Sequence, residues 1–296
     1  MEPLYSNIKI VYYSGTGGTA MVAESFRKSL EEKGCSCTVD KITNELAGGQ
    51  LGRHVQHGHS LLLLLFPVHA FNAPEPVYKW IESLSAVNET EAAVISVSGG
   101  GEISPNTACR ISSIKRLAAK GYRVVYETMI IMPSNILVAT KEPLAAMLLR
   151  MLPRKVNLAV HDILTGTYKK GAPIMIDRLL SIAGEMEKPM ARFWGRYIKG
   201  LPHCDGCGWC AKNCPSHNIS IVEGKPKFAS KCHMCLKCIY GCPKKALTPG
   251  ICKSVIIKEG YDLNCLSEKA LLNEAADVNE LAKGYIWSGV KKYLLE

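Results

Sequence analysis

The sequence predicts an α/β protein: a doubly wound parallel sheet of five strands, followed by a small domain that binds metal. Apolar, β-rich runs alternate with helical patterns through residues 7–132, which is typical of a parallel sheet. A loop of glycine, serine and threonine follows the first run, and two matching groups of four cysteines lie between residues 204 and 242. With 296 residues, the chain is long enough for about two domains.

Five short runs have the composition of strands buried in a parallel sheet. They cover residues 7–13, 36–42, 61–68, 92–98 and 122–132. Helical spacing of apolar residues lies between them, over 20–33, 75–84 and 106–120. This alternation suits the strand order 2-1-3-4-5, which places the carboxyl ends of the strands along one ligand-binding edge.

The loop after the first strand has the composition of a phosphate-binding loop. It comprises Ser14, Gly15, Thr16, Gly17, Gly18 and Thr19. Glycines let the backbone come close to an anion, and the amides of the loop and of the following helix can donate to it. A Walker A loop would need a lysine that is missing here, and a dinucleotide loop would need glycine where Ala20 stands. The hydroxyl groups favour the terminal phosphate of flavin mononucleotide (FMN); the simpler alternative is a glycine-rich turn.

Eight of the 13 cysteines form the pattern C-x₂-C-x₂-C-x₃-C-P, which occurs twice at an offset of 28 residues. Each run is the ligand pattern of a bacterial 4Fe–4S site, and in two-cluster proteins the fourth cysteine of a run serves the other cluster. The predicted ligands are Cys204, Cys207, Cys210 and Cys242 for one cluster, and Cys232, Cys235, Cys238 and Cys214 for the other. Zinc sites use more widely separated pairs and fit this spacing poorly. Disulfides are not expected, because no secretory signal precedes the cysteines.

The loop at 14–19 resembles the phosphate loop of flavodoxins, S/T-x-T-G-N-T, with Gly18 in place of the usual asparagine. Together with the tandem cysteine runs, it resembles the flavo-ferredoxins of anaerobes, in which a flavodoxin domain is fused to a bacterial two-cluster (2×4Fe–4S) ferredoxin. The resemblance implies a flavodoxin-like FMN domain at 1–198, a ferredoxin domain at 199–252 and a helical extension at 253–296 packed on the body. The implied cofactors are FMN and two 4Fe–4S clusters.

Two further loops are expected to hold the flavin. The resemblance places one side of the ring system at the loop after the third strand, which comprises Pro67, Val68, His69, Ala70, Phe71 and Asn72. His69 or Phe71 could flank the ring, although Phe71 could equally pack within the loop. The loop after the fourth strand comprises Ser98, Gly99, Gly100 and Gly101. Its glycines would let the backbone approach a flat ring, and the alternative is a flexible linker.

Residues 133–200 and the C-terminal tail carry weaker patterns. Helices are expected at 143–152 and 173–187, and one or two in the tail from residue 252, notably at 267–283. Five methionines in the region 133–200 are expected to fill the core: Met147, Met151, Met175, Met186 and Met190. The five cysteines outside the two runs are expected to be small buried hydrophobic residues: Cys35, Cys37, Cys109, Cys252 and Cys265.

The net charge of +10 at pH 7 does not by itself indicate binding to nucleic acid. Lysine and arginine are dispersed, and two clusters and a flavin phosphate would lower the net charge to roughly +4. A mild basic bias favours an acidic protein as redox partner, or an anionic substrate. The longest apolar run, at 61–66, is too short for a membrane span, so a cytoplasmic protein of a reducing cell is expected.

These features predict an electron-transfer protein that relays single electrons between a protein partner and FMN through the two clusters. The alternative is an FMN-dependent reductase of a small organic substrate, with electrons supplied by the clusters. No catalytic residue stands out for it; His69, Tyr122 and Glu102 are weak candidates for a proton donor. A third alternative makes the clusters purely structural parts of a binding module.

Overall fold

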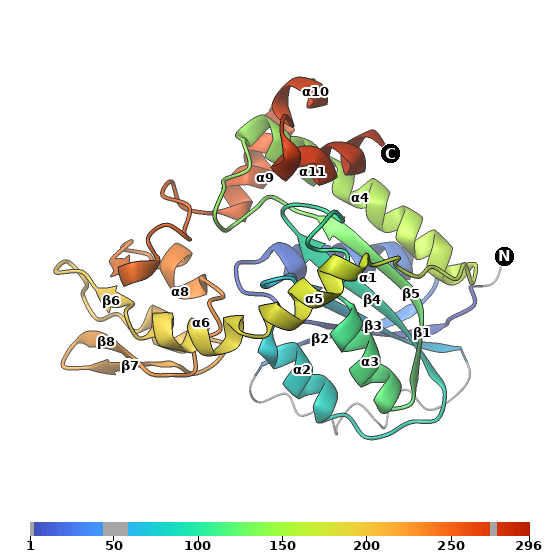
Figure 1. The fold of residues 1–296 in the computed structure, drawn as a ribbon, viewed down its shortest axis with the longest axis horizontal. Helices are drawn as coiled ribbons and strands as arrows, with labels where there is room; N and C mark the ends of the chain where they lie inside the picture. The colour runs from blue at the N-terminus through green and yellow to red at the C-terminus, as the bar shows by residue number, and fades with distance from the viewer. Residues whose placement is uncertain (1–2, 44–58, 273–276) are drawn as a thin grey trace.

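Five parallel strands form the central sheet of the computed structural model, which describes residues 3–43, 59–272 and 277–296 (Figure 1). The strands are β1 (Asn7–Tyr12), β2 (Ser36–Lys41), β3 (Ser60–Pro67), β4 (Thr90–Ser98) and β5 (Tyr122–Ile131). Their order is β2-β1-β3-β4-β5, and every neighbouring pair is parallel. This is the flavodoxin-like order, so the predicted doubly wound sheet is confirmed.

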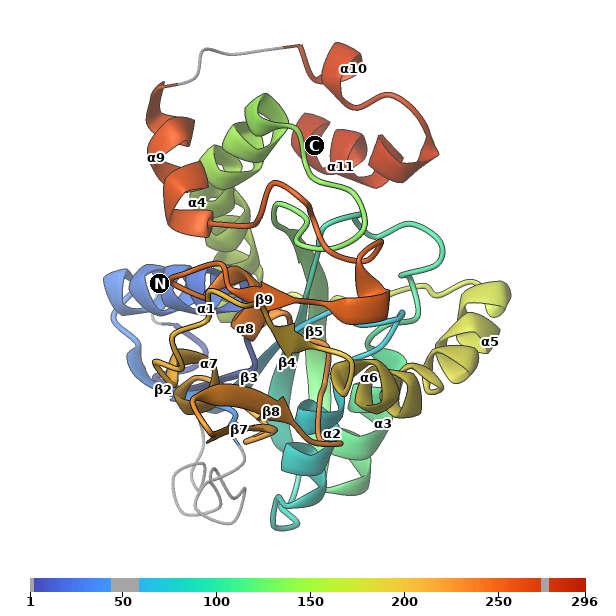
Figure 2. The ribbon, with the colours of Figure 1, turned by 90° about the vertical axis from the view of Figure 1, so that its left-hand side faces the viewer.

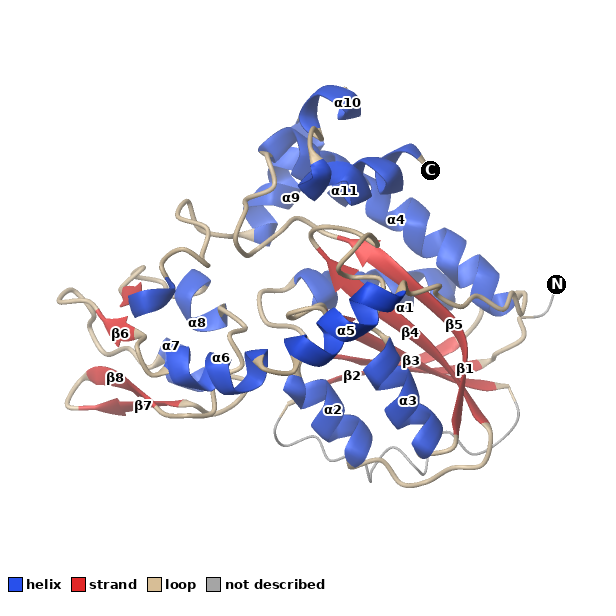
Figure 3. Ribbon diagram, viewed as in Figure 1, coloured by secondary structure: helices blue, strands red, loops and turns tan. Residues whose placement is uncertain are grey.

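Helices cover both faces of the sheet (Figure 3). On one face lie α1 (Gly18–Glu32) and α4 (Glu142–Leu164), and on the other α2 (Glu75–Glu82) and α3 (Ile111–Ala119). Successive side chains of a strand point to opposite faces, so a strand covered on both faces has no polar side. β3 shows this most clearly: Leu61, Leu63 and Leu65 pack toward α1 and α4, and Leu62, Leu64 and Phe66 pack toward α2 and α3.

α4 is much longer than the helix predicted at 143–152. It continues to Leu164 and contains Pro153 in its interior. A proline removes one helical hydrogen bond and usually ends or kinks a helix, which is why the sequence pattern favoured a stop there. Beyond the proline, Val156 and Val160 are fully buried against the sheet and α1. Burial of this apolar stripe offsets the lost hydrogen bond and keeps the helix continuous.

The helix predicted at 173–187 is two shorter helices, α5 (Met175–Gly184) and α6 (Glu187–Gly195). They lie on the surface, with α6 beside the cysteine-bearing region (Figures 1 and 2). Three of the methionines expected in the core are instead exposed: Met175 by 80%, Met186 by 63% and Met190 by 43%. Met147 and Met151 do pack against a hydrophobic cluster, as predicted.

The C-terminal segment forms α9 (Leu263–Leu272), α10 (Val278–Leu281) and α11 (Tyr285–Leu295), where one or two helices were predicted, notably at 267–283. These helices pack on the N-terminal half of α4. Val290 and Leu294 of α11 share a buried cluster with Leu144 and Leu148 of α4. Within the described ranges, none of the helices combines the length and the apolar character that crossing a bilayer requires.

The cysteine-bearing region lies in front of the sheet when the molecule is viewed as in Figure 2. Its short elements are β6 (Lys199–Gly200), α7 (Trp209–Lys212), β7 (Ile219–Val222), β8 (Lys225–Phe228), α8 (Lys237–Tyr240), β9 (Leu247–Thr248) and a 3₁₀ turn, η2 (Gly250–Cys252). β7 and β8 form an antiparallel hairpin, and β6 pairs with β9 in an antiparallel manner. The first strand of this region therefore pairs with its last strand.

Candidate functional site

The 28-residue repeat of the sequence is also a repeat of the backbone. α7 and α8 start at corresponding residues, Trp209 and Lys237. Left-handed backbone conformations recur at the same offset, in the pairs Gly206 and Met234, Gly208 and Leu236, and His217 and Lys245. Residues other than glycine rarely adopt positive φ, because this backbone conformation costs them about 1 kcal/mol or more. The second run nevertheless follows the loop path of the first, even where it carries Met234 and Leu236.

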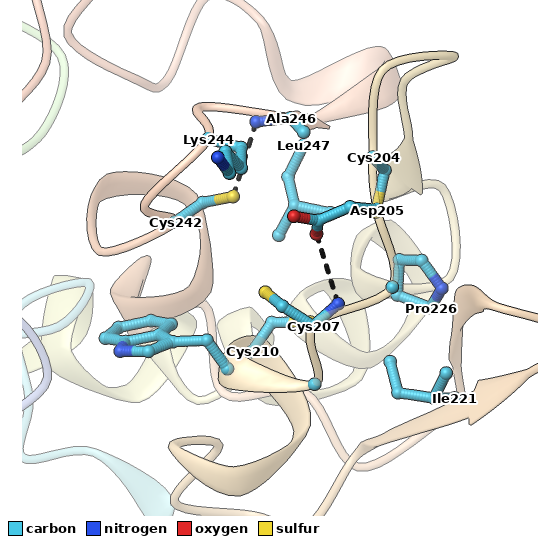
Figure 4. Close-up of a pocket in the computed structure, with 13 residues that line it drawn as sticks. Cys204, Asp205, Cys207, Cys210, Ile221, Pro226, Cys242, Lys244, Ala246 and Leu247 are labelled. Atoms are coloured by element: carbon cyan, nitrogen blue, oxygen red, sulfur yellow. Dashed lines mark hydrogen bonds between the residues drawn. The ribbon is translucent and has the colours of Figure 1, made fainter.

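The eight motif cysteines are arranged around two cavities. Cys204, Cys207, Cys210 and Cys242 line one of about 320 Å³, shown in Figure 4. Cys214, Cys232, Cys235 and Cys238 line the other, of about 390 Å³. In each cavity, three cysteines come from one run and the fourth comes from the other run. This is the grouping that the sequence predicted for the two clusters. That these cysteines ligate clusters stays a prediction.

Backbone N–H groups donate to several of the sulfurs. Asn218 donates to Cys214 Sγ, and Ala246 donates to Cys242 Sγ, each at 3.3 Å and again 28 residues apart. Met234 donates to Cys232 Sγ at 3.4 Å. Such bonds stabilise negative charge on a thiolate, and in iron–sulfur proteins they help to set the reduction potential.

Two thiols of the second cavity, those of Cys235 and Cys238, have pKa values raised by burial. Burial and the neighbouring Cys235, Cys232 and Cys214 raise the pKa of Cys238 well above its ordinary value. Four crowded thiolates need a positively charged core to hold them, and the four irons of a cubane supply one, each iron binding a single thiolate. The donor set therefore fits a 4Fe–4S cluster. Among the described residues, no three His, Cys, Asp or Glu side chains are grouped so that they could hold a single metal ion.

The loop 14–19 connects β1 to α1 with the geometry of an anion site. Gly17 has a φ of 102°, and its N–H donates to Ser14 Oγ at 3.2 Å. No described side chain caps the first turn of α1. The N–H groups of that turn lack helical partners and are free for an anionic ligand. Thr16 Oγ1 already accepts a hydrogen bond from Asn135 Nδ2 at 2.6 Å, which fixes its side chain.

The loop 67–72 makes a tight turn after β3. His69 and Asn72 exchange two backbone hydrogen bonds of 2.8 Å, and Ala70 and Phe71 between them both have positive φ. The Asn72 side chain is buried and bonded to Ser181 of α5: its Nδ2 donates to the backbone oxygen, and its Oδ1 accepts from Ser181 Oγ at 2.7 Å. The side chain of Asn72 and both of its backbone polar groups are thus already hydrogen-bonded within the protein, and its flavin contact stays a prediction. His69, Ala70 and Phe71 stay partly exposed.

The loop 98–101 needs its glycines partly because other segments pack on it. A Cβ at Gly99 would lie 2.7 Å from Ser134 Cβ, and one at Gly101 would lie 2.8 Å from the backbone of Gly289 in α11. At Gly100 the nearest neighbour would be Asn106 Nδ2 at 3.7 Å, so this glycine alone has room beside it. Ser134 and α11 therefore pack against this loop at two of its three glycines.

The candidate proton donors of the reductase alternative are not grouped together. Tyr122 begins β5 and pairs with Thr90 at the amino ends of the strands, opposite the loops just described. Glu102 forms an ion pair with Arg110, a guanidinium that is 1% exposed and also bonds Glu127 at 2.8 Å. Of the three candidates, only His69 lies in a predicted flavin loop.

Several residues at this edge were not indicated by sequence. Tyr261 donates to the backbone oxygen of Pro133 at 3.2 Å, and Leu263 lies 3.8 Å from a Cβ built at Gly17. Tyr285 donates to the backbone oxygen of Ser104 at 2.9 Å. The C-terminal segment therefore covers the loops that follow β1 and β4. No local pattern marks such residues, because their role depends on where a distant segment packs.

The fold and the site together define an α/β protein with a flavodoxin-like sheet and a duplicated four-cysteine region at its carboxyl edge. No protein-family model matches the sequence, and no curated protein matches it. Similar solved structures include the Streptococcus pneumonia TIGR4 flavodoxin, a flavodoxin from the domain Archaea and rubredoxin oxygen:oxidoreductase from Desulfovibrio gigas. The identities are 14%, 14% and 12%, with TM-scores of 0.39, 0.37 and 0.41. The similarities cover 53%, 54% and 56% of this chain, and 97%, 98% and 37% of the other chains.

Proposed function

We propose that the protein is an electron-transfer flavo-iron–sulfur protein. It relays single electrons between a protein redox partner and FMN through two 4Fe–4S clusters. The cysteine region is proposed to act as a bacterial-type two-cluster ferredoxin domain, with the eight motif cysteines as ligands. Bound FMN would supply a centre that exchanges electrons singly or in pairs, whereas a cubane exchanges one.

The observation that carries the proposal is the direct contact between the two candidate sites. Cys235, in the second cysteine run, lies against Gly15 in the loop 14–19, so close that a Cβ at Gly15 would be 2.6 Å from the Cys235 oxygen. Electron exchange needs redox centres near one another. A purely structural metal site would not require such a contact with the edge of the sheet that is expected to bind the flavin.

The chain's own residues have distinct roles in this proposal. The uncapped first turn of α1 and the hydroxyl groups of the loop 14–19 would bind the FMN phosphate. The loops 67–72 and 98–101 would hold the ring system between them. The N–H groups that donate to cysteine sulfurs would tune the clusters, and the helices α9–α11 would limit solvent access to the carboxyl edge.

Anaerobic purification, followed by counting of iron, acid-labile sulfide and flavin per chain, tests the proposal. We expect about eight irons, about eight sulfides and about one FMN, with absorbance that dithionite bleaches. Cys238→Ser should lose about four irons, whereas Cys265→Ser, a change at an exposed cysteine outside the runs, should keep all eight. Zinc in place of iron, or a chain without flavin, would contradict the proposal. Reoxidation by small unsaturated compounds in the absence of a protein acceptor would favour the reductase instead.

A further inference from the structure

The two groups of four cysteines have different surroundings, although their sequences and backbones repeat. We term Cys214, Cys232, Cys235 and Cys238 the inner site, and Cys204, Cys207, Cys210 and Cys242 the outer site. A Cβ at Gly15 would lie 2.6 Å from the backbone oxygen of Cys235 and 2.9 Å from its Cβ, so only glycine fits there. Cys207, which corresponds to Cys235 in the first run, is exposed to solvent. The inner site therefore adjoins the loop 14–19, whereas the corresponding cysteine of the outer site is open to solvent.

A hydrogen-bonded chain also joins the inner site to this loop. Tyr240 Oη, on α8, donates to the backbone oxygen of Asn135 at 2.8 Å. Asn135 Nδ2 in turn donates to Thr16 Oγ1 at 2.6 Å. The first repeat carries an exposed lysine, Lys212, where the second carries Tyr240, so the outer site lacks this link. Tyr240, which is replaced by Lys212 in the first repeat, therefore helps to hold the inner site next to the carboxyl edge of the sheet.

Tyr13 is a side chain at the carboxyl end of β1 that lies beside the inner site. It directly follows β1 and is 1% exposed. Its hydroxyl has no regular hydrogen bond to any described residue, and the thiol of Cys235 lies beside it. A buried hydroxyl is costly without a partner, and here the available acceptor is sulfur.

We propose that Tyr13 donates a hydrogen bond to the Cys235 sulfur when the inner site holds its cluster, and thereby raises the reduction potential of that cluster alone. The inference rests on the proposed function, and Tyr13 is a positioning residue in it. A hydrogen bond to a ligand sulfur stabilises the reduced form, which carries one more negative charge. Lys237 and Lys41 also lie near Cys235 and add positive charge there.

Potentiometric titration of the intact protein, followed by electron paramagnetic resonance, tests this role with Tyr13→Phe. The substitution removes only the hydroxyl group. We expect one of the two cluster midpoints to fall by about 59 mV, a roughly tenfold weaker reduction, while the other stays unchanged. Tyr126→Phe is the matched control. Tyr126 is also 1% exposed in the same sheet, but its hydroxyl bonds Asp162 at 3.1 Å, so neither midpoint should move.

The outcomes separate this inference from the proposed function. If Tyr13→Phe keeps its iron and flavin but shifts neither midpoint, or shifts both equally, the tyrosine has no specific role and the electron-transfer function still stands. A wild-type protein without reducible clusters would overturn both. If Tyr13→Phe does not fold, 3-fluorotyrosine at position 13 keeps the shape and strengthens the donor. It should raise the same single midpoint, and unchanged midpoints would overturn the inference.

Discussion

The contact between Gly15 and Cys235 predicts that Gly15→Ala destabilises the protein, because the added methyl group would clash with Cys235. The added methyl group would sit 2.6 Å from the Cys235 oxygen, whereas ordinary contact begins near 3.4 Å. The loop 14–19 and the cysteine loop would have to separate by about 0.8 Å, or distort locally, and such overpacking typically costs about 1–3 kcal/mol. Gly15 does not have a left-handed backbone, so the penalty comes from packing and not from backbone strain.

Gly18→Ala is the matched control, because Gly18 lies in the same loop and also lacks positive φ. Its Cβ would have neighbours only at 3.9 Å, on Met132 and Tyr261, so alanine fits without movement. Urea unfolding of the loaded protein, followed by circular dichroism, compares the two variants with the wild type. Gly15→Ala should lower the free energy of unfolding by about 1–3 kcal/mol, and Gly18→Ala should leave it within about 0.5 kcal/mol. Equal stability of the two variants would refute the packing of the cysteine loop on the sheet edge.

Three other predictions concern the rest of the chain. Arg110→Met should lower the free energy of unfolding in urea by about 3–5 kcal/mol, because it leaves the buried carboxylate of Glu127 without its charged partner. Arg27→Met, on the surface, should lower it by less than about 1 kcal/mol. Similar losses in the two variants would argue against a buried ion pair. Burial raises the pKa of Cys109 to about 11, so this thiol should stay protonated and unalkylated by iodoacetamide at pH 8, while exposed Cys265 reacts; peptide mass spectrometry reports both. Removing iron with a chelator should unfold residues 199–252 and leave the parallel sheet intact, which hydrogen exchange would show as lost protection confined to that segment.

Parts of the fold governed by local pattern followed from the sequence. Residues 61–66 of β3 are all apolar because both faces of the strand are buried, and such a run is recognisable without tertiary information. The same holds for the glycine–hydroxyl loop after β1 and for the cysteine spacing, since short-range geometry dictates both. Failures occurred where a long-range contact outweighed a local signal. α4 continues through Pro153 because the residues beyond the proline are buried against the sheet. Met175 lies on a surface helix and is exposed, although methionine usually packs inside.

By itself, the sequence determined the alternation of strands and helices through residues 7–132, the loop that precedes α1 and the two repeated sets of possible thiolate ligands. It did so because backbone preference and ligand spacing act over a few residues. Only the tertiary structure decided which set adjoins the sheet, since that depends on Gly15 meeting Cys235 across more than two hundred residues of chain. Only the tertiary structure, likewise, placed Tyr13 beside a sulfur and the C-terminal helices over the carboxyl edge. Contacts of this kind arise when separately formed elements pack, and two repeats with the same cysteine spacing then acquire unequal environments.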